Sequence, residues 1–198
     1  MDKISKANKL ILIFAGILIA IYVFVFSMPQ EIDKFALIPA KLASGEFWRL
    51  LTFQFAHLNS THLLENIMGA GIAAGIATEL KMRAQKFSWV YLLAGMFAVI
   101  PIYVVAPFVA LGASGAIYGA FGAVSMDAKK FGLDSRILIG LLAATIIAQI
   151  LIVKNVANMQ QGAAHFTGLV IGVALFLSYD KVMAKFTTKR RKVLRGTK

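Results

Sequence analysis

The chain has 198 residues, of which 59% are hydrophobic and 15% charged, and its mean hydropathy is +0.76. A soluble domain of this length needs more polar surface, so we expect one integral membrane domain over residues 1–198. The absence of cysteine excludes disulfides and thiolate metal sites, and the formal net charge of +12 must be explained by where the basic residues lie.

Six apolar segments predict an all-α fold with six membrane-spanning helices. Their ranges are 10–28, 61–80, 87–106, 114–126, 137–153 and 163–182. The first follows three lysines, Lys3, Lys6 and Lys9, without a small-residue cleavage site, so we expect a retained helix rather than a removed signal peptide. Residues 29–60 are more polar and too long for a turn, which predicts a structured loop.

The fourth segment is unusually short. Its 13 residues make a helix of about 20 Å, whereas the hydrocarbon core of a bilayer is about 30 Å thick. We therefore expect this helix to be partly buried, beginning about 10 Å inside the membrane. Ser114 would then lie at the floor of a water-filled cavity that opens to the non-cytoplasmic side.

The basic residues are unevenly distributed around these helices. With both termini and the loops after the second and fourth helices on one side, that side carries 17 Lys and Arg, and the other carries 4. This asymmetry predicts both termini in the cytoplasm and a cell inner or plasma membrane location. We interpret the basic C-terminal tail, about 183–198, as an anchor near anionic lipid rather than a nucleic-acid site.

Glycines recur at four-residue spacing in three of the segments. The pairs are Gly71 and Gly75, Gly115 and Gly119, and Gly168 and Gly172. Small residues at this spacing allow helices to approach closely in lipid. The second, fourth and sixth helices are therefore predicted to pack against one another.

Polar side chains in these helices suggest a chemical role, because such groups are costly in a bilayer. His62 and Asn66 are four residues apart and share one helix face. Serine is a weak nucleophile until a base takes its proton, and His165 could serve Ser114 in that way. The Ser114 backbone N–H, His62 and Asn66 could donate to an oxyanion, and Tyr118 could stack on His165. No carboxylate lies at an obvious position, which favours a Ser–His dyad over a triad.

Four motifs in this order resemble the rhomboid family of intramembrane serine proteases over nearly the whole chain. They are FWRLL (47–51), HLNSTHLLEN (57–66), GASG (112–115) with Tyr118 after it, and AHFTG (164–168). The GxSG string alone is weak, because soluble hydrolases carry similar strings. The order and span of all four make the resemblance specific.

The resemblance implies a minimal six-helix rhomboid bundle that cleaves transmembrane protein substrates near the non-cytoplasmic face. Ser114 would be the nucleophile and His165 the general base, with His62, Asn66 and the Ser114 N–H forming the oxyanion hole. Tyr118, Gly112 and Gly115 would support this site. Trp48, Arg49 and His57 would be structural residues of the first loop, and 154–162 would form a cap loop. No cofactor, metal or nucleic acid is implied; the partners are substrates and the bilayer.

Glu65 departs from the expected pattern, because an apolar residue is expected on the second-helix surface that faces the fifth helix. It could be water-facing or protonated near the cavity, or it could act as a substrate gate. Two other functions stay open: an inactive rhomboid-like protein that binds membrane proteins, and a small transporter. A transporter would favour inverted repeats, and the sequence has no internal repeat. The sequence indicates neither the substrate nor the oligomeric state.

Overall fold

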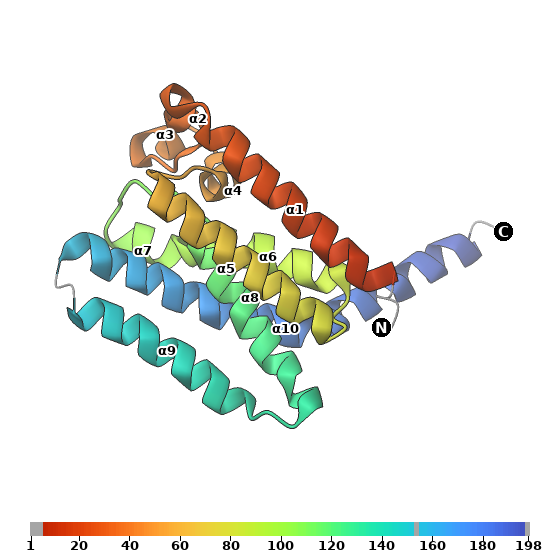
Figure 1. Ribbon diagram of the computed structural model, residues 1–198. Helices are drawn as coiled ribbons and strands as arrows, with labels where there is room; N and C mark the ends of the chain where they lie inside the picture. Colours follow the sequence, from red (N-terminus) through yellow and green to blue (C-terminus); the bar gives the residue numbers. More distant parts are fainter. Residues whose placement is uncertain (1–5, 153–154, 197–198) are drawn as a thin grey trace.

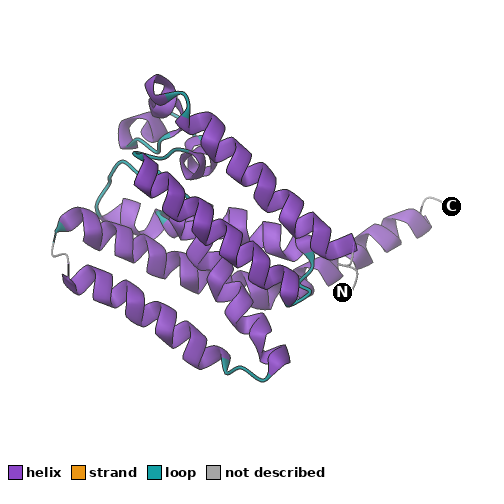
Figure 2. Ribbon diagram, in the orientation of Figure 1, coloured by secondary structure: helices purple, strands orange, loops and turns teal. Residues whose placement is uncertain are grey.

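The computed structural model describes residues 6–152 and 155–196, with side chains over 9–152 and 155–185, and nearly every described segment is helical (Figure 2). The long helices are α1 (Lys6–Phe26), α5 (Ser60–Glu79), α6 (Ala84–Ala98), α8 (Ser114–Asp127), α9 (Ser135–Ile152) and α10 (Val156–Gly196). The short ones are η1 (Pro29–Glu31), α2 (Ile32–Phe35), α3 (Pro39–Ala43), α4 (Arg49–Thr52), η2 (Phe53–Phe55), α7 (Ile100–Val105) and η3 (Ala128–Phe131). The expected all-α fold is confirmed, and residues 29–59 form the structured loop that was predicted.

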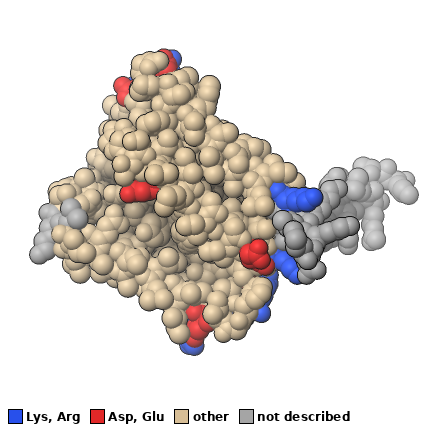
Figure 3. Space-filling view, viewed as in Figure 1, with Lys and Arg blue, Asp and Glu red and all other residues tan. Residues whose placement is uncertain are grey.

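Four described segments are long and apolar enough to cross a membrane: Lys9–Phe26, Ala84–Val105, Ser135–Ile152 and Val156–Lys185. α8 is shorter, with 14 residues, and α5 carries the polar residues His62, Glu65 and Asn66. Figure 3 shows charged side chains gathered towards the ends of the molecule, with a mostly uncharged surface between them. These features are those of a multi-pass membrane protein.

The third expected helix, 87–106, is interrupted. α6 ends at Ala98 and α7 begins at Ile100, with Pro101 in its first turn. Proline has no backbone N–H, so it is tolerated in a first turn but breaks a continuous helix. Pro101 was the available sign of this break in the sequence.

The sixth expected helix is longer than predicted at both ends. α10 begins at Val156, and the Asn155 side chain caps it by accepting a hydrogen bond from the Asn158 N–H at 2.8 Å. The segment predicted to be a cap loop, 154–162, is therefore helical from Val156 onward, and Lys154 lies outside the described residues. The predicted tail is also helical as far as Gly196, although its side chains beyond 185, like those of Lys3 and Lys6, are not described.

α8 is the central helix of the bundle, as Figure 1 shows. It packs against α6, α10 and α5, and α1 covers α5 and α6 from outside. α9 lies at the edge, against α10 and α8, and of its described residues only Ser135 and Ile146 are buried. Both termini lie at one end of the bundle, and the first loop, with α2, α3 and α4, lies at the other.

Glycines allow α8 and α10 to approach closely. A methyl group on Gly172 would overlap the Gly119 carbonyl oxygen, and one on Gly168 would overlap the Gly115 carbonyl oxygen. A methyl group on Gly122 would lie 2.7 Å from the Leu169 carbonyl oxygen. The predicted packing of the fourth and sixth helices is confirmed.

The second helix, α5, also packs against α8, but not through the two glycines that were predicted. A methyl group on Gly71 or Gly75 would meet nothing within 4 Å, so neither glycine brings α5 close to a neighbour. Gly69 makes the close contact instead, since a methyl group there would lie 2.9 Å from Ile117 Cγ2 of α8. Four-residue spacing alone did not reveal which helix face is buried.

A buried lysine fastens α6 to α10 at the end where the termini lie. Lys86 is 7% exposed, and its Nζ lies 3.5 Å from the centre of the Phe176 ring and 3.1 Å from Asp180 Oδ2. Arg83 also pairs with Asp180. The single carboxylate therefore holds two cations against α10, which fixes this end of the bundle.

The glycine contacts yield a stability prediction. Gly172→Ala should lower the free energy of unfolding in detergent micelles by about 1–3 kcal/mol, because the new methyl group must push α8 and α10 apart. Gly71→Ala is the matched control: its methyl group enters open space, and alanine favours a helix by up to about 1 kcal/mol. Equal decreases in the free energy of unfolding of the two variants would contradict the role assigned to the α8–α10 contact.

Candidate active site

Backbone pairing with the first loop positions the segment that leads to Ser114. Leu37 and Ala110 exchange two backbone hydrogen bonds of 2.9 and 3.0 Å, the only β-bridge in the part of the chain that the structure describes. The Gly112 N–H donates to the Phe53 carbonyl oxygen at 2.9 Å. Gly112 has φ +103°, which favours glycine, and α8 begins two residues later with Ser114.

Arg49 holds the first loop together. Its side chain is 2% exposed, and its Nη1 donates to the carbonyl oxygens of Asp33 and Ala36 at 2.5 and 2.6 Å. Its Nε donates to Glu46 Oε2 at 2.8 Å, which completes a charge-assisted pair. Trp48, the other residue of this motif, is 56% exposed. The contacts of Arg49 are thus to the loop itself.

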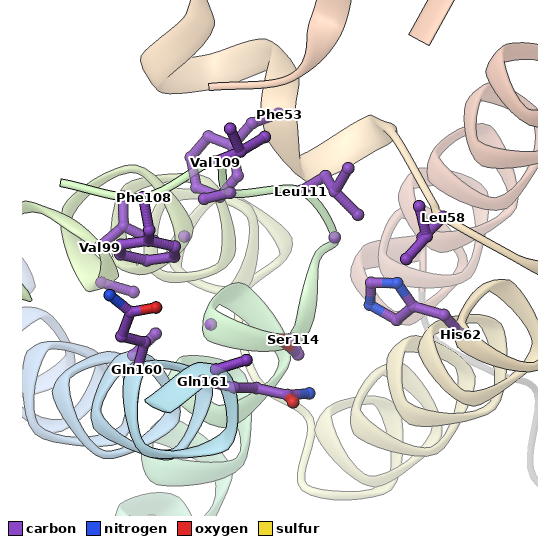
Figure 4. Close-up of a pocket in the computed structure, with 17 residues that line it drawn as sticks. Phe53, Leu58, His62, Val99, Phe108, Val109, Leu111, Ser114, Gln160 and Gln161 are labelled. Atoms are coloured by element: carbon purple, nitrogen blue, oxygen red, sulfur yellow. The ribbon is translucent and has the colours of Figure 1, made fainter. Parts of the chain in front are cut away.

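Ser114 and His62 line one cavity of about 480 Å³. Figure 4 shows the His62 ring projecting from α5 towards the space above Ser114, which opens α8. Of the 17 described residues that line the cavity, four have polar side chains: His62, Ser114, Gln160 and Gln161. The cavity is therefore mostly apolar, with few polar side chains.

His165 lies beside this cavity rather than on its surface. Its ring is 4% exposed and stacks on Tyr118, with 4.5 Å between ring centres and 22° between planes. Neither ring nitrogen has a hydrogen-bond partner among the described residues, so Ser114 and His165 are not hydrogen-bonded in this structure. Thr145 of α9 lies close to the Tyr118 hydroxyl. Ala164, the residue before His165, does line the cavity.

Two other polar residues of the second-helix motif lie behind His62. Asn66 is 3% exposed, and its Nδ2 donates to the His62 carbonyl oxygen at 2.7 Å rather than into the cavity. The His57 ring lies 5.2 Å from the His62 ring and 5.0 Å from the Tyr22 ring. Burial and, to a smaller extent, the neighbouring His62 together lower the pKa of His57 to about 4, so its ring is neutral at pH 7.

Glycine at 112 also leaves space for the His62 ring. A methyl group on Gly112 would lie 2.5 Å from His62 Cε1 and Nε2. A methyl group on Gly115, the other glycine of the motif, would lie 2.7 Å from the Ala98 Cβ of α6. One glycine therefore permits the approach of α5 to the loop before Ser114, and the other permits the approach of α6 to α8.

Sequence reasoning missed two of the four polar cavity residues. Gln160 and Gln161 fall in the segment that was predicted to be a loop, whereas they lie in the second turn of α10. The available signal was a pair of amides directly before the small residues that precede His165. Glu65 is exposed on α5 and close enough to His62 for an electrostatic interaction, but it does not line the cavity. The described residues include no group of three or more His, Asp or Glu that could hold a metal ion.

Comparison with known proteins adds independent evidence. The protein-family model for the Rhomboid domain matches residues 44–179. The chain is 36% identical over 148 residues to the "Putative rhomboid protease YdcA" of Bacillus subtilis (strain 168), which covers 71% of each protein. It is 32% identical over 138 residues to the "Rhomboid protease GluP" of the same organism, covering 66% of this chain but 26% of GluP. Since the family match includes Ser114, His62 and His165 and spans more than half of the sequence, this chain belongs to the rhomboid family.

Proposed function

We propose that this chain is an intramembrane serine endopeptidase that cleaves transmembrane segments of membrane proteins near the non-cytoplasmic face. The observation that carries the proposal is Ser114, which opens the short helix α8 inside a cavity that it shares with His62. His165 stacks on Tyr118, one turn after Ser114 on the same helix, and supplies the base. The relatives named as rhomboid proteases support the same reaction class.

In this proposal the chain crosses the membrane six times, with α1, α5, α6–α7, α8, α9 and α10 as the spans. The 14 residues of α8 extend about 21 Å, less than the roughly 30 Å of a hydrocarbon core, so Ser114 lies below the membrane surface. Both termini face the cytoplasm, because the side that carries them would hold 17 of the 21 basic residues. The site then opens to the opposite side of an inner or plasma membrane.

The first step joins Ser114 to the substrate. The Ser114 Oγ attacks the carbonyl carbon of the scissile peptide while its proton passes to a nitrogen of His165. Neither His165 nitrogen has a partner within the described part of the chain, so the ring is available as an acceptor. The two side chains are not hydrogen-bonded in the absence of substrate, and catalytic hydrogen bonds often form only when substrate is bound.

The negative charge that develops on the carbonyl oxygen needs hydrogen-bond donors. The Ser114 backbone N–H is free of a helical partner because it lies at the N-terminus of α8. The His62 ring, which projects into the cavity, supplies a second donor. Asn66 could supply a third, after its Nδ2 releases the His62 carbonyl oxygen. His165 then protonates the leaving amine, and a water molecule activated by His165 hydrolyses the acyl-enzyme.

The cavity also indicates how the substrate must be presented. Its volume is about 480 Å³, which accommodates a few extended residues but not an intact helix. A transmembrane helix must therefore unwind before its peptide bond reaches Ser114. Helix-destabilising small residues near the non-cytoplasmic end of a substrate would lower the cost of this unwinding.

Loss of the dyad tests the proposed function directly. Ser114→Ala and His165→Ala should each reduce cleavage of a model transmembrane substrate by at least about 1,000-fold, because the two residues act as a unit. Ser114→Ala should also abolish labelling by a fluorophosphonate in detergent. Ser125→Ala is the matched control, since Ser125 is buried on the same helix away from the cavity. Wild-type cleavage by either dyad variant would overturn the proposal.

The contact between Gly112 and His62 tests the oxyanion donor. Gly112→Ala should displace the His62 ring and lower the turnover number by about 100-fold, the usual effect of losing one oxyanion donor. Gly45→Ala is the control, because Gly45 has a matching φ of +100° but open space around it. It introduces the same backbone strain without touching His62. Similar turnover in the two variants would remove His62 from the proposed mechanism.

Glu65 yields a prediction about specificity. A carboxylate exposed on α5 near His62 should attract Lys or Arg close to the scissile bond. Glu65→Gln should reduce the preference for Lys over Gln at one flanking position by about two- to fivefold, with the fold and basal activity intact. Glu79→Gln, at the other end of α5, should leave the Lys/Gln cleavage ratio unchanged. The same ratio in wild type and Glu65→Gln would reject the selectivity role.

A further inference from the structure

Gln161 presents an unpaired amide to the cavity that contains Ser114. Three residues on one face of α10, Ala157, Gln161 and Ala164, line this cavity. They are four and three residues apart, so they follow one another along the same side of the helix. Because the residues one turn before and after Gln161 are alanines, nothing on α10 covers its side chain, which is exposed.

The neighbouring glutamine is placed differently. Gln160 Nε2 donates to the Ala106 carbonyl oxygen at 3.4 Å, which ties it to the end of α7. In Figure 4 the Gln160 side chain points towards Phe108 and Val99, whereas the Gln161 side chain extends along the side of the cavity where Ser114 lies. Gln161 has no hydrogen-bond partner among the described residues. The two adjacent amides therefore differ in whether they are free to bind a ligand.

An extended substrate needs hydrogen-bond donors and acceptors for its backbone, and the Gln161 amide offers both. When a transmembrane helix unwinds, its peptide N–H and C=O groups lose their partners in a region with little water, and each unpaired group is costly. The cavity is poor in polar side chains: Ser114 and His62 are assigned to the reaction, and Gln160 is held by Ala106. A glutamine amide both donates and accepts, so it can pair with the N–H and C=O of one extended residue.

We propose that Gln161 is a substrate-binding residue that hydrogen-bonds to the backbone of the unwound substrate beside the scissile bond. This inference rests on the proposed protease function and names a recognition element for it. Because the amide binds backbone rather than a side chain, it selects substrates by their ability to adopt an extended conformation. Sequence preferences must then come from elsewhere, and Glu65 is placed to provide one.

The test compares Gln161→Leu, which keeps the size and loses the hydrogen bonds, with Gln160→Leu in the same cavity. Gln161→Leu should lower kcat/KM for a transmembrane substrate by about 5- to 15-fold, the effect of one or two backbone hydrogen bonds. Gln160→Leu should stay within about twofold of wild type. Labelling of Ser114 by a small fluorophosphonate, which has no flanking backbone, should be unchanged in both variants. Gln161→Ala provides a second variant, since alanine already occupies the neighbouring positions on this face.

Replacing single backbone amides of the substrate with esters identifies the substrate N–H that hydrogen-bonds to Gln161. Semisynthetic substrates with a single ester in place of one backbone amide near the scissile bond lack that N–H. For the wild-type enzyme, the ester at one such position should lower kcat/KM relative to the amide substrate. For Gln161→Leu, the same ester should cause no further decrease in kcat/KM. The proposal would be overturned if Gln161→Leu kept the wild-type kcat/KM. It would also be overturned if the effects of the ester and of Gln161→Leu on kcat/KM were additive at every position. Slower fluorophosphonate labelling of Gln161→Leu would also overturn it, by placing the amide at the oxyanion. Absence of labelling in wild type would instead refute the protease function.

Discussion

The contact between glycines and carbonyl oxygens of α8 and α10 is the constraint on which the site depends. Gly168 and Gly172 lie against the carbonyl oxygens of Gly115 and Gly119, so the two backbones approach closely. This contact also sets their relative translation, because shifting α10 by one residue would bring side chains against those carbonyls. With the register set, His165 lies beside Tyr118 rather than a turn above or below it.

The other side of Ser114 depends on the first loop. Arg49 donates hydrogen bonds to the carbonyl oxygens of Asp33 and Ala36 and thereby fixes the loop conformation around Leu37. Leu37 then pairs with Ala110, two residues before Gly112. A buried cation remote from the cavity thus controls the backbone that leads into α8. The buried Arg49 is tolerated because backbone carbonyl oxygens and Glu46 accept its hydrogen bonds.

Much of the fold could be predicted from the sequence, because long apolar runs between charged loops form helices in a bilayer. The break at Pro101 was signalled by the proline but was missed inside an apolar run, and the early start of α10 depends on the Asn155 cap. Motif spacing pointed to Ser114 and His62, and both residues line one cavity. It gave no information on Gln161, or on the direction of the Asn66 amide, because side-chain orientation depends on contacts between distant segments.

The peripheral position of α9 has a thermodynamic consequence. Only Ser135 and Ile146 of its described residues are buried and most of its side chains are apolar, so one side of α9 is open to acyl chains. Moving α9 outward exchanges contacts with side chains for contacts with lipid tails, which are equally apolar, so no hydrophobic penalty opposes the motion. The polar contact that would change is the one between Thr145 and the Tyr118 hydroxyl. A membrane helix of similar hydropathy could therefore take the place of α9 in a nearly isoenergetic exchange, next to the tyrosine that supports His165.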